Sequence, residues 1–407
     1  MQKILWKIFW FLALVAFTSI SYFLSVCINC PFIVVVLVAV LFGFLSYRWF
    51  NKNIVPTVVA SIGKRSLTWS YIILAAGIAI LTNKIFYIEP EFGRWDAWAL
   101  WNYHAKYLDL EHIKFITNQT KLDHPDYPLL LPGIIAFFWK LFGTQSLMVP
   151  YIISLFVTII IPVIIFLALY RKNLIIAGLV LVLMATDDKF IDYGLFQYAD
   201  LPLGLFFLCA FISVQYAKEN KAMVTFTAIF LGCCIWTKNE GSMLSLVFIL
   251  FHLKTLFANG KWKNFLAGFL LPLVILTAYK IYMPATDIIG EQSHKTLLQF
   301  LDWDRYNMIW ASMSDNINDR FFYLKIGAMI YAVICLAEKK MPGKDMLVLL
   351  TCLIAVFFVY VFTTKDLQWH LESSMDRVLF QLMPAFTFVI GLRLCKLRFY
   401  LSDEIRQ

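Results

Sequence analysis

Long apolar segments constrain the fold of this chain more than any other feature of its sequence. They recur from the N-terminus to residue 395, and most are close to 20 residues long. An α-helix of about that length crosses the hydrocarbon core of a membrane, which is roughly 30 Å thick. The strands of an outer-membrane barrel are instead alternating segments of about 10 residues. The sequence therefore predicts an all-α, polytopic membrane protein.

We expect about twelve transmembrane helices. The predicted spans are 4–26, 31–50, 68–88, 147–170, 174–190, 200–217, 222–237, 241–257, 265–283, 322–337, 346–363 and 378–395. Composition agrees with this prediction, since 61% of the residues are hydrophobic and only 15% are charged, whereas a soluble domain has roughly 25% charged residues. A soluble enzyme, a disordered chain and a secreted disulfide scaffold are excluded.

The net charge of +9 first suggests an acidic partner such as a nucleic acid. Basic residues, however, concentrate in every second connection between the predicted spans, which is the pattern of cytoplasmic loops in membrane proteins. This assignment places both termini in the cytoplasm and leaves a small negative excess outside. The positive charge therefore indicates orientation, and we expect no nucleic-acid partner.

The segment 128–142 is apolar but is only 15 residues long and contains Pro132 and Gly133. Counting it as a crossing would place Arg171 and Lys172 outside. We therefore expect a helix that lies at the outer interface or re-enters there. It belongs to the first of two elaborated outer loops, 89–146 and 284–321.

Carboxylates follow the third predicted span directly. Glu89 and Asp96 lie in the segment EPEFGRWDAW, close to low-dielectric surroundings that raise the pKa of a carboxyl and suit it to act as a base. Trp95 and Trp98 are typical of an interfacial helix. The alternative is a solvated loop with an aromatic anchor.

Further polar side chains lie at predicted outer helix ends. His124, Asp126 and Tyr127 are held in a proline-stiffened segment, where Asp126 would otherwise be an ordinary helix cap. Asp200 opens the sixth predicted span and is also a candidate N-cap. Both segments are candidate binding sites on the outer side.

Two pairs of side chains complete the candidate set. Lys238 and Glu240 lie between two short apolar spans, where polar groups are costly and therefore suggest function. Lys238 suits a phosphate, with Glu240 orienting it, and the alternative is a short solvated turn. His370 and Arg377 are seven residues apart, which is two helical turns. Arginine suits the recognition of phosphate oxygens, so we expect Arg377 to bind an anionic lipid headgroup or a fixed carboxylate partner such as Asp376 or Glu372.

These motifs, taken in order, resemble the GT-C superfamily of integral-membrane glycosyltransferases, which includes protein O-mannosyltransferases and the aminoarabinose transferases that modify lipid A. The matching segments are RWDAW (94–98), HPDYPLLLP (124–132), YADLP (198–202), TKNEG (237–241) and WHLESSMDRVLFQLMP (369–384). The resemblance covers about residues 68–395. It implies a two-helix addition at 1–67, a catalytic membrane module at 68–283 and a C-terminal part at 284–407. Adjacent acids, common in the family's first loop, are replaced here by separated ones.

The resemblance also implies the chemistry. A polyprenyl-phosphate sugar would be the donor, and a lipid, glycan or protein at the outer face would be the acceptor. Asp96, with Glu89 as second choice, would be the base of an inverting transfer, and Arg377, Lys238 and His370 would stabilise the leaving phosphate. Asp200, His124 and Asp126 would position sugar or acceptor.

Cofactor, partner and location follow from the same interpretation. No compact metal-ligand motif is present. The sequence still allows a divalent cation bound by carboxylates on the outer side, and we expect no other cofactor. Membrane lipids surround the chain, and we expect a bacterial inner membrane with the site facing the periplasm or exterior. The second outer loop, rich in aromatics such as Trp303 and Trp310, suits a lid or an acceptor groove.

Two other classes of function remain open. A transporter or flippase of lipid-linked intermediates would also carry polar groups in its helices, but typically at the membrane midplane and within internal repeats. A membrane scaffold without activity would not require Asp96, Lys238 and Arg377 to converge. The enzyme hypothesis therefore predicts that these three side chains lie close together in the folded protein.

Overall fold

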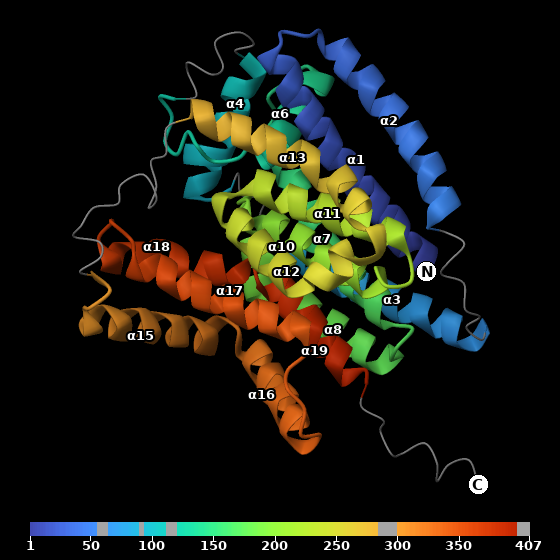
Figure 1. Cartoon of the computed structure of the whole chain (residues 1–407), viewed down its shortest axis with the longest axis vertical. Helices are drawn as coiled ribbons and strands as arrows, with labels where there is room; N and C mark the ends of the chain where they lie inside the picture. The colour runs from blue at the N-terminus through green and yellow to red at the C-terminus, as the bar shows by residue number, and fades with distance from the viewer. Residues whose placement is uncertain (55–63, 89–92, 111–119, 284–298, 397–407) are drawn as a thin grey trace.

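The computed structural model describes residues 1–54, 64–88, 93–110, 120–283 and 299–396 (Figure 1). Within these ranges every regular element is a helix, which confirms the predicted all-α class there. The helices are α1 (Gln2–Cys27), α2 (Phe32–Asn53), α3 (Lys64–Phe86), η2 (Ala97–Trp101), α4 (Asn102–Leu110), α6 (Leu130–Phe142), α7 (Met148–Leu169), α8 (Leu174–Thr186), α9 (Asp188–Leu195), α10 (Asp200–Tyr216), α11 (Lys221–Thr237), α12 (Asn239–Phe257), η3 (Ala258–Gly260), α13 (Trp262–Tyr282), α15 (Trp303–Arg320), α16 (Phe322–Ala337), α17 (Lys344–Val361), α18 (Leu367–Phe380) and α19 (Met383–Leu394).

Many of these helices have the length and composition of membrane spans. Among the described residues, seven are long and apolar enough to cross a membrane, and up to ten qualify if each bent pair forms one span. The bent pairs are α9 with α10 (112°), α15 with α16 (100°) and α18 with α19 (41°). Each of the twelve predicted spans coincides with helix, but α8 and α11 are among the shorter apolar helices. The helices are those of a polytopic membrane protein.

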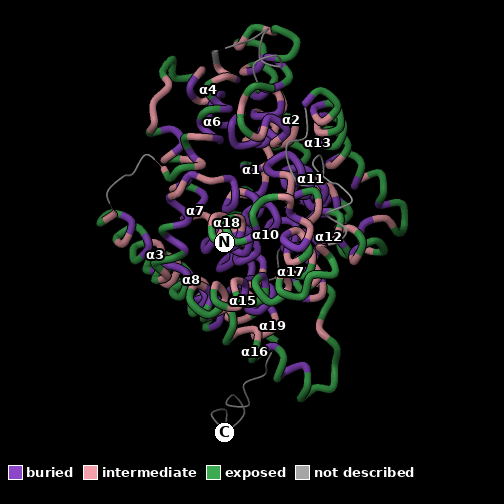
Figure 2. Tube along the Cα trace, turned by 90° about the vertical axis from the view of Figure 1, so that its left-hand side faces the viewer, coloured by how far each residue is buried: buried purple, intermediate pink, exposed green. Residues whose placement is uncertain are grey.

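The centre of the bundle is formed by α10, which is buried along nearly its whole length because it is apolar on all sides. It packs against α7, α11, α12 and α19. A small residue allows close packing on this helix: a Cβ at Gly204 would lie 2.7 Å from the carbonyl oxygen of Gln381. Figure 2 shows buried residues gathered in the middle of the bundle and exposed residues along its periphery.

The segment predicted to lie at the outer interface forms α6, which is buried in protein except for its last turn, where Leu141 and Phe142 are exposed. It packs against α1 and α4, and the hydroxyl of Ser19 donates to the carbonyl oxygen of Leu130 at 2.8 Å. The helix α1 also packs against α7 and α11, while α2 lies along α1 (Figure 1). The first helix is therefore part of the common core.

Helices α15, α17 and α18 form a layer on one side of the bundle (Figure 1). The guanidinium of Arg305 on α15 donates to three carbonyl oxygens at the end of α17: those of Val361 (2.9 Å), Thr363 (2.9 Å) and Tyr360 (3.2 Å). Carbonyls at a helix C-terminus lack partners within the helix. Arg305 supplies these partners and fixes α15 against α17.

Candidate functional site

Asp96 and Arg377 form an ion pair although 281 residues separate them. Asp96 precedes the π-helical turn η2, and Arg377 lies near the end of α18. Short π-helical turns are frequent at functional sites. Both side chains are only partly buried, with 28% of Asp96 and 18% of Arg377 exposed. The two residues that the sequence predicted as base and phosphate ligand therefore lie in direct contact.

Tyr198 connects the two partners. Its ring centroid lies 5.0 Å from the guanidinium carbon of Arg377, and its hydroxyl accepts a hydrogen bond from the backbone N–H of Asp96 at 3.4 Å. Arg377 also donates through Nε and Nη2 to the carbonyl oxygen of Ser373. These contacts use three of the five N–H groups of a guanidinium, so two N–H groups have no partner among the described residues.

Lys238 lies between two carboxylates. Its Nζ is 2.9 Å from Asp200 and 3.0 Å from Glu240, and only 6% of Lys238 and 4% of Asp200 are exposed. Asp200 also attracts Arg377 electrostatically, so it joins the two ion pairs into one group. Asp96, Lys238 and Arg377 therefore belong to one group of two cations and three carboxylates.

This arrangement differs from two local expectations. The N-cap of α10 is Ala199, and the Asp200 carboxylate binds Lys238 in place of a backbone N–H. Likewise α6 begins at Leu130, too far along the chain for Asp126 to cap it. Lys238 is engaged by carboxylates in this state, and one oxygen of Glu240, Oε2, is buried without a hydrogen-bond partner among the described residues.

A second polar cluster adjoins the first through Asn239. The buried Asp126 carboxylate accepts from Lys280 (2.7 Å) and from the amide of Asn239 (2.9 Å). Burial raises the pKa of Asp126, but the hydrogen bond and charge of Lys280, with help from Asn239, lower it below its ordinary value. Lys280 also donates to the side-chain oxygen of Asn239 (2.8 Å). The cluster fixes the loop before α6 to α12 and α13.

Aromatic rings pack against one another in the same loop before α6. The Tyr127 ring lies 4.7 Å from that of His124 and 5.8 Å from that of Trp101. His124 adopts a left-handed backbone conformation (φ 51°), which is uncommon for residues other than glycine. Tyr127 also acts electrostatically on Lys238. The predicted residues His124, Asp126 and Tyr127 thus lie together, and Tyr127 is close to Lys238 of the charged group.

His370 contacts α17. Its Nδ1 lies 2.8 Å from the hydroxyl of Thr363, and its ring lies 4.8 Å from that of Tyr360. The hydroxyls of Tyr360 and Ser374 are 2.8 Å apart. Because α18 begins at Leu367, His370 and Arg377 are two turns apart on one helix, as their spacing predicted. His370 interacts electrostatically with Arg377 but does not bind it directly.

Sequence analysis missed several residues of the site. Lys280 is a lone lysine within the predicted span 265–283. Because charges inside a span suggest function, this lysine could have been identified from the sequence. Tyr198 and Asn239 lie inside quoted motifs but carry no charge to mark them. Glu89, the second-choice base, lies outside the described residues.

The described residues contain no group of three or more His, Cys, Asp or Glu side chains arranged to hold a metal ion. Glu89 and Glu91 fall in the range 89–92, which the structure does not describe. The carboxylates of the described site are instead neutralised by lysine and arginine.

His104 predicts a pH dependence of stability. Its ring is buried and donates from Nε2 to the backbone oxygen of Asp123 at 3.0 Å, and burial lowers its pKa from 6.5 to about 4. Between pH 6.5 and pH 4 the His104 ring therefore binds a proton in the unfolded chain but not in the folded protein. The free energy of unfolding falls as the pH is lowered through this range. From pH 7 to pH 5 this loss is about 2 kcal/mol.

Thermal unfolding of the purified protein at pH 7 and pH 5 checks this prediction. We expect His104→Gln to reduce the difference between the two melting temperatures, whereas Lys106→Gln, an exposed change on the same helix α4, should leave it unaltered. An unchanged difference in His104→Gln would show that the ring does not titrate as described.

The chain was compared with known proteins in three ways. No protein-family model matches it, and neither curated proteins nor solved structures show significant similarity to it.

Proposed function

We propose that this protein is an inverting glycosyltransferase that moves a sugar from a polyprenyl-phosphate donor to a lipid, glycan or protein acceptor. The ion pair of Asp96 and Arg377 is the observation that supports this function best. It joins a partly exposed carboxylate to a guanidinium with unused N–H groups. The displacement of a sugar from phosphate needs a base for the acceptor hydroxyl and a cation for the leaving phosphate, and this pair supplies one of each.

In the proposed reaction, Asp96 takes the proton of the acceptor hydroxyl as its oxygen forms a bond to the anomeric carbon. The bond between that carbon and the phosphate oxygen breaks on the opposite side, which inverts the configuration. Negative charge then develops on the polyprenyl phosphate, and Arg377 stabilises it by hydrogen bonding. Protonation of Asp96 weakens its hold on Arg377 at the moment when the phosphate needs that cation.

The other charged residues have supporting roles in this proposal. Lys238 holds Asp200 and Glu240 in place, and it reaches the donor phosphate only if it exchanges one of these partners. Asp126 and His124 position the sugar through the loop before α6, with Tyr127 packed between His124 and Trp101. His370 orients α18 against α17.

The proposal includes a GT-C-like architecture of about twelve membrane spans, in which α8 and α11 also cross. Both termini would be cytoplasmic by the distribution of basic residues. The site would then face the periplasm or exterior of a bacterial inner membrane, where lipid-linked sugars replace nucleotide sugars as donors.

A product assay tests the proposed function. The purified protein in nanodiscs is given undecaprenyl-phosphate glucose, mannose or arabinose together with a membrane extract as acceptor source. We expect free polyprenyl phosphate and an acceptor that is heavier by one sugar, both detected by mass spectrometry. If none of the three donors loses its sugar at a rate above that of empty nanodiscs, the proposal fails.

A transporter or flippase of lipid-linked intermediates is the second candidate, and the bent helix pairs favour it. Broken helices next to buried charges are typical of transporter binding sites. Asp200 lies at the break between α9 and α10, and Arg377 lies close to the break between α18 and α19. Movement of fluorescent polyprenyl-phosphate glucose across proteoliposomes, with its sugar retained, would favour this function over transfer.

A further inference from the structure

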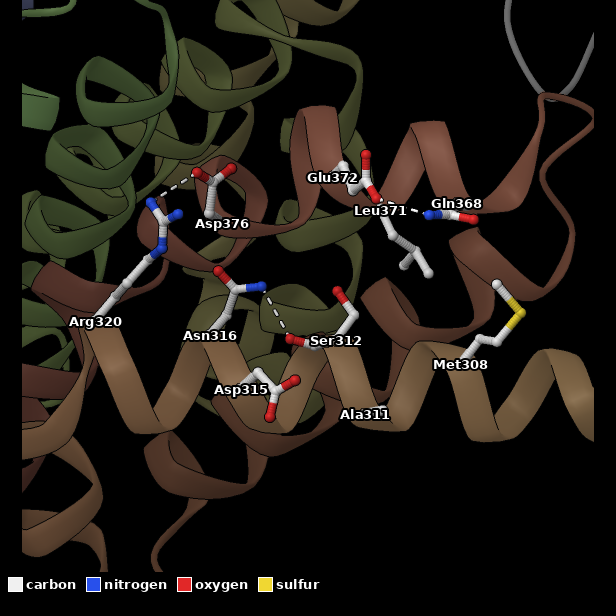
Figure 3. A pocket seen from close by; sticks show the side chains of 10 residues that line it. All are labelled: Met308, Ala311, Ser312, Asp315, Asn316, Arg320, Gln368, Leu371, Glu372 and Asp376. Carbon is white, nitrogen blue, oxygen red and sulfur yellow. Dashed lines mark hydrogen bonds and ion pairs between the residues drawn. The ribbon is translucent and has the colours of Figure 1, made fainter.

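A pocket of about 610 Å³ lies between α15 and α18 (Figure 3). Asp96 and Lys238 are not among the residues that line it. This volume falls in the range of small-molecule sites. Polar side chains from both helices line it: Ser312, Asp315 and Asn316 from α15, and Gln368, Glu372 and Asp376 from α18.

Helical spacing explains how α18 serves two sites. Gln368, Glu372 and Asp376 are four residues apart and therefore lie along one face, which borders the pocket. Arg377 is the next residue after Asp376, and it turns to Asp96. The pocket and the candidate base are therefore connected through adjacent residues of one helix.

The walls of the pocket are held at both ends. Arg305 fixes one end of α15 to the carbonyls that close α17. At the other end, Arg320 pairs with Asp376 at 2.9 Å, and Tyr193 of α9 donates to the same carboxylate. The pocket is thus formed between helices that are already fixed, and a ligand has no need to order them on binding.

The chemistry of the lining selects for hydrogen-bond donors. Asp315 and Glu372 present carboxylate oxygens, and the cation at the pocket, Arg320, is already paired with Asp376. The amide nitrogens of Asn316 and Gln368 donate to Ser312 and Glu372, so their oxygens are left for a ligand. Such a surface repels phosphate and carboxylate and matches hydroxyl groups.

We propose that this pocket binds a neutral sugar of the acceptor. The apolar side chains of Leu371 and Met308 in the same lining suit the C–H face of a sugar ring, and the carboxylate and amide oxygens suit its hydroxyls. The role as acceptor site rests on the proposed function. The preference for a polyhydroxyl ligand over an anionic one rests on the pocket alone.

Direct binding tests the pocket without any transfer. Neutral gluco-, manno- and galacto-configured trisaccharides, their uronic-acid counterparts and spermidine are titrated against the protein in nanodiscs by calorimetry. We expect at least one neutral trisaccharide to bind at least tenfold more tightly than its uronic-acid counterpart. Asp315→Asn combined with Glu372→Gln should weaken that binding at least tenfold, while Asp319→Asn, an exposed change on the same helix, should leave it unaltered.

Several outcomes would overturn the proposal. Binding of no neutral trisaccharide would do so, as would binding of spermidine alone, which would make the pocket a cation site. Sugar binding without any transfer activity would leave the pocket standing and reject the proposed function. Transfer with an unchanged acceptor KM in the double variant would instead reject the acceptor role.

Discussion

Replacing Lys238 with methionine is expected to destabilise the folded protein by about 3–5 kcal/mol, because it leaves two carboxylates near each other without their cation. Asp200 is almost completely buried, and Lys238 is the cation that both it and Glu240 contact. Methionine fills a similar volume, so lost charge pairing and not lost packing should dominate. The melting temperature of the purified protein should fall by roughly 3–6 °C.

Two further variants make this prediction specific. Lys189→Met removes an exposed lysine and should leave the melting temperature nearly unchanged. The double variant Lys238→Met with Asp200→Asn removes one of the unpaired charges and should recover a large part of the loss, because the two residues act as a pair. Equal melting temperatures for the single and double variants would contradict the ion-pair explanation.

The helices of this protein were largely predictable from its sequence. Apolar runs such as 147–170 and 200–217 mark α7 and α10 closely, because every helical turn in lipid or in the bundle core must be apolar. The bends were not predictable in this way. The break of 112° between α9 and α10 depends on how neighbouring helices pack. The hydrophobic periodicity of the sequence does not report that packing.

The candidate site was predictable as a set of residues but not as a set of contacts. Asp96 and Arg377 were both named from their positions at helix ends, yet their pairing depends on the tertiary arrangement of η2 and α18. Lys238 was expected to meet a phosphate and lies instead between Asp200 and Glu240. A sequence shows where costly charges lie, while the fold decides which of them neutralise each other.

The second outer loop gives a further example. Aromatic residues such as Trp303 and Trp310 suggested a lid or acceptor groove. In the structure 78% of Trp303 and 68% of Trp310 are exposed, and neither lines the pocket. The pocket lies on another face of the same helix α15, where residues 308, 311, 312, 315 and 316 repeat with helical spacing. Its polar lining alternates with ordinary surface residues, so the pattern is visible only once α18 is placed opposite.

Asp96→Asn is the substitution with the largest expected effect on activity. Asparagine keeps the size of the side chain and an oxygen that can accept from Arg377, but it cannot take a proton from an acceptor hydroxyl. General-base catalysis contributes about 10²–10⁴-fold to a rate, so transfer from a polyprenyl-phosphate sugar should fall by that factor. Donor binding should change far less, because Arg377 keeps its position and its unused N–H groups.

The measurement compares single-turnover transfer and donor binding in the same preparation. Asp188→Asn serves as the matched control, because Asp188 pairs with Lys84 at an exposed position with 78% of its side chain accessible. A normal transfer rate in Asp96→Asn would exclude Asp96 as the base and leave Glu89 as the candidate. Loss of transfer together with loss of donor binding would instead mean that Asp96 acts by holding Arg377, since a base that only removes a proton has no reason to affect the bound phosphate.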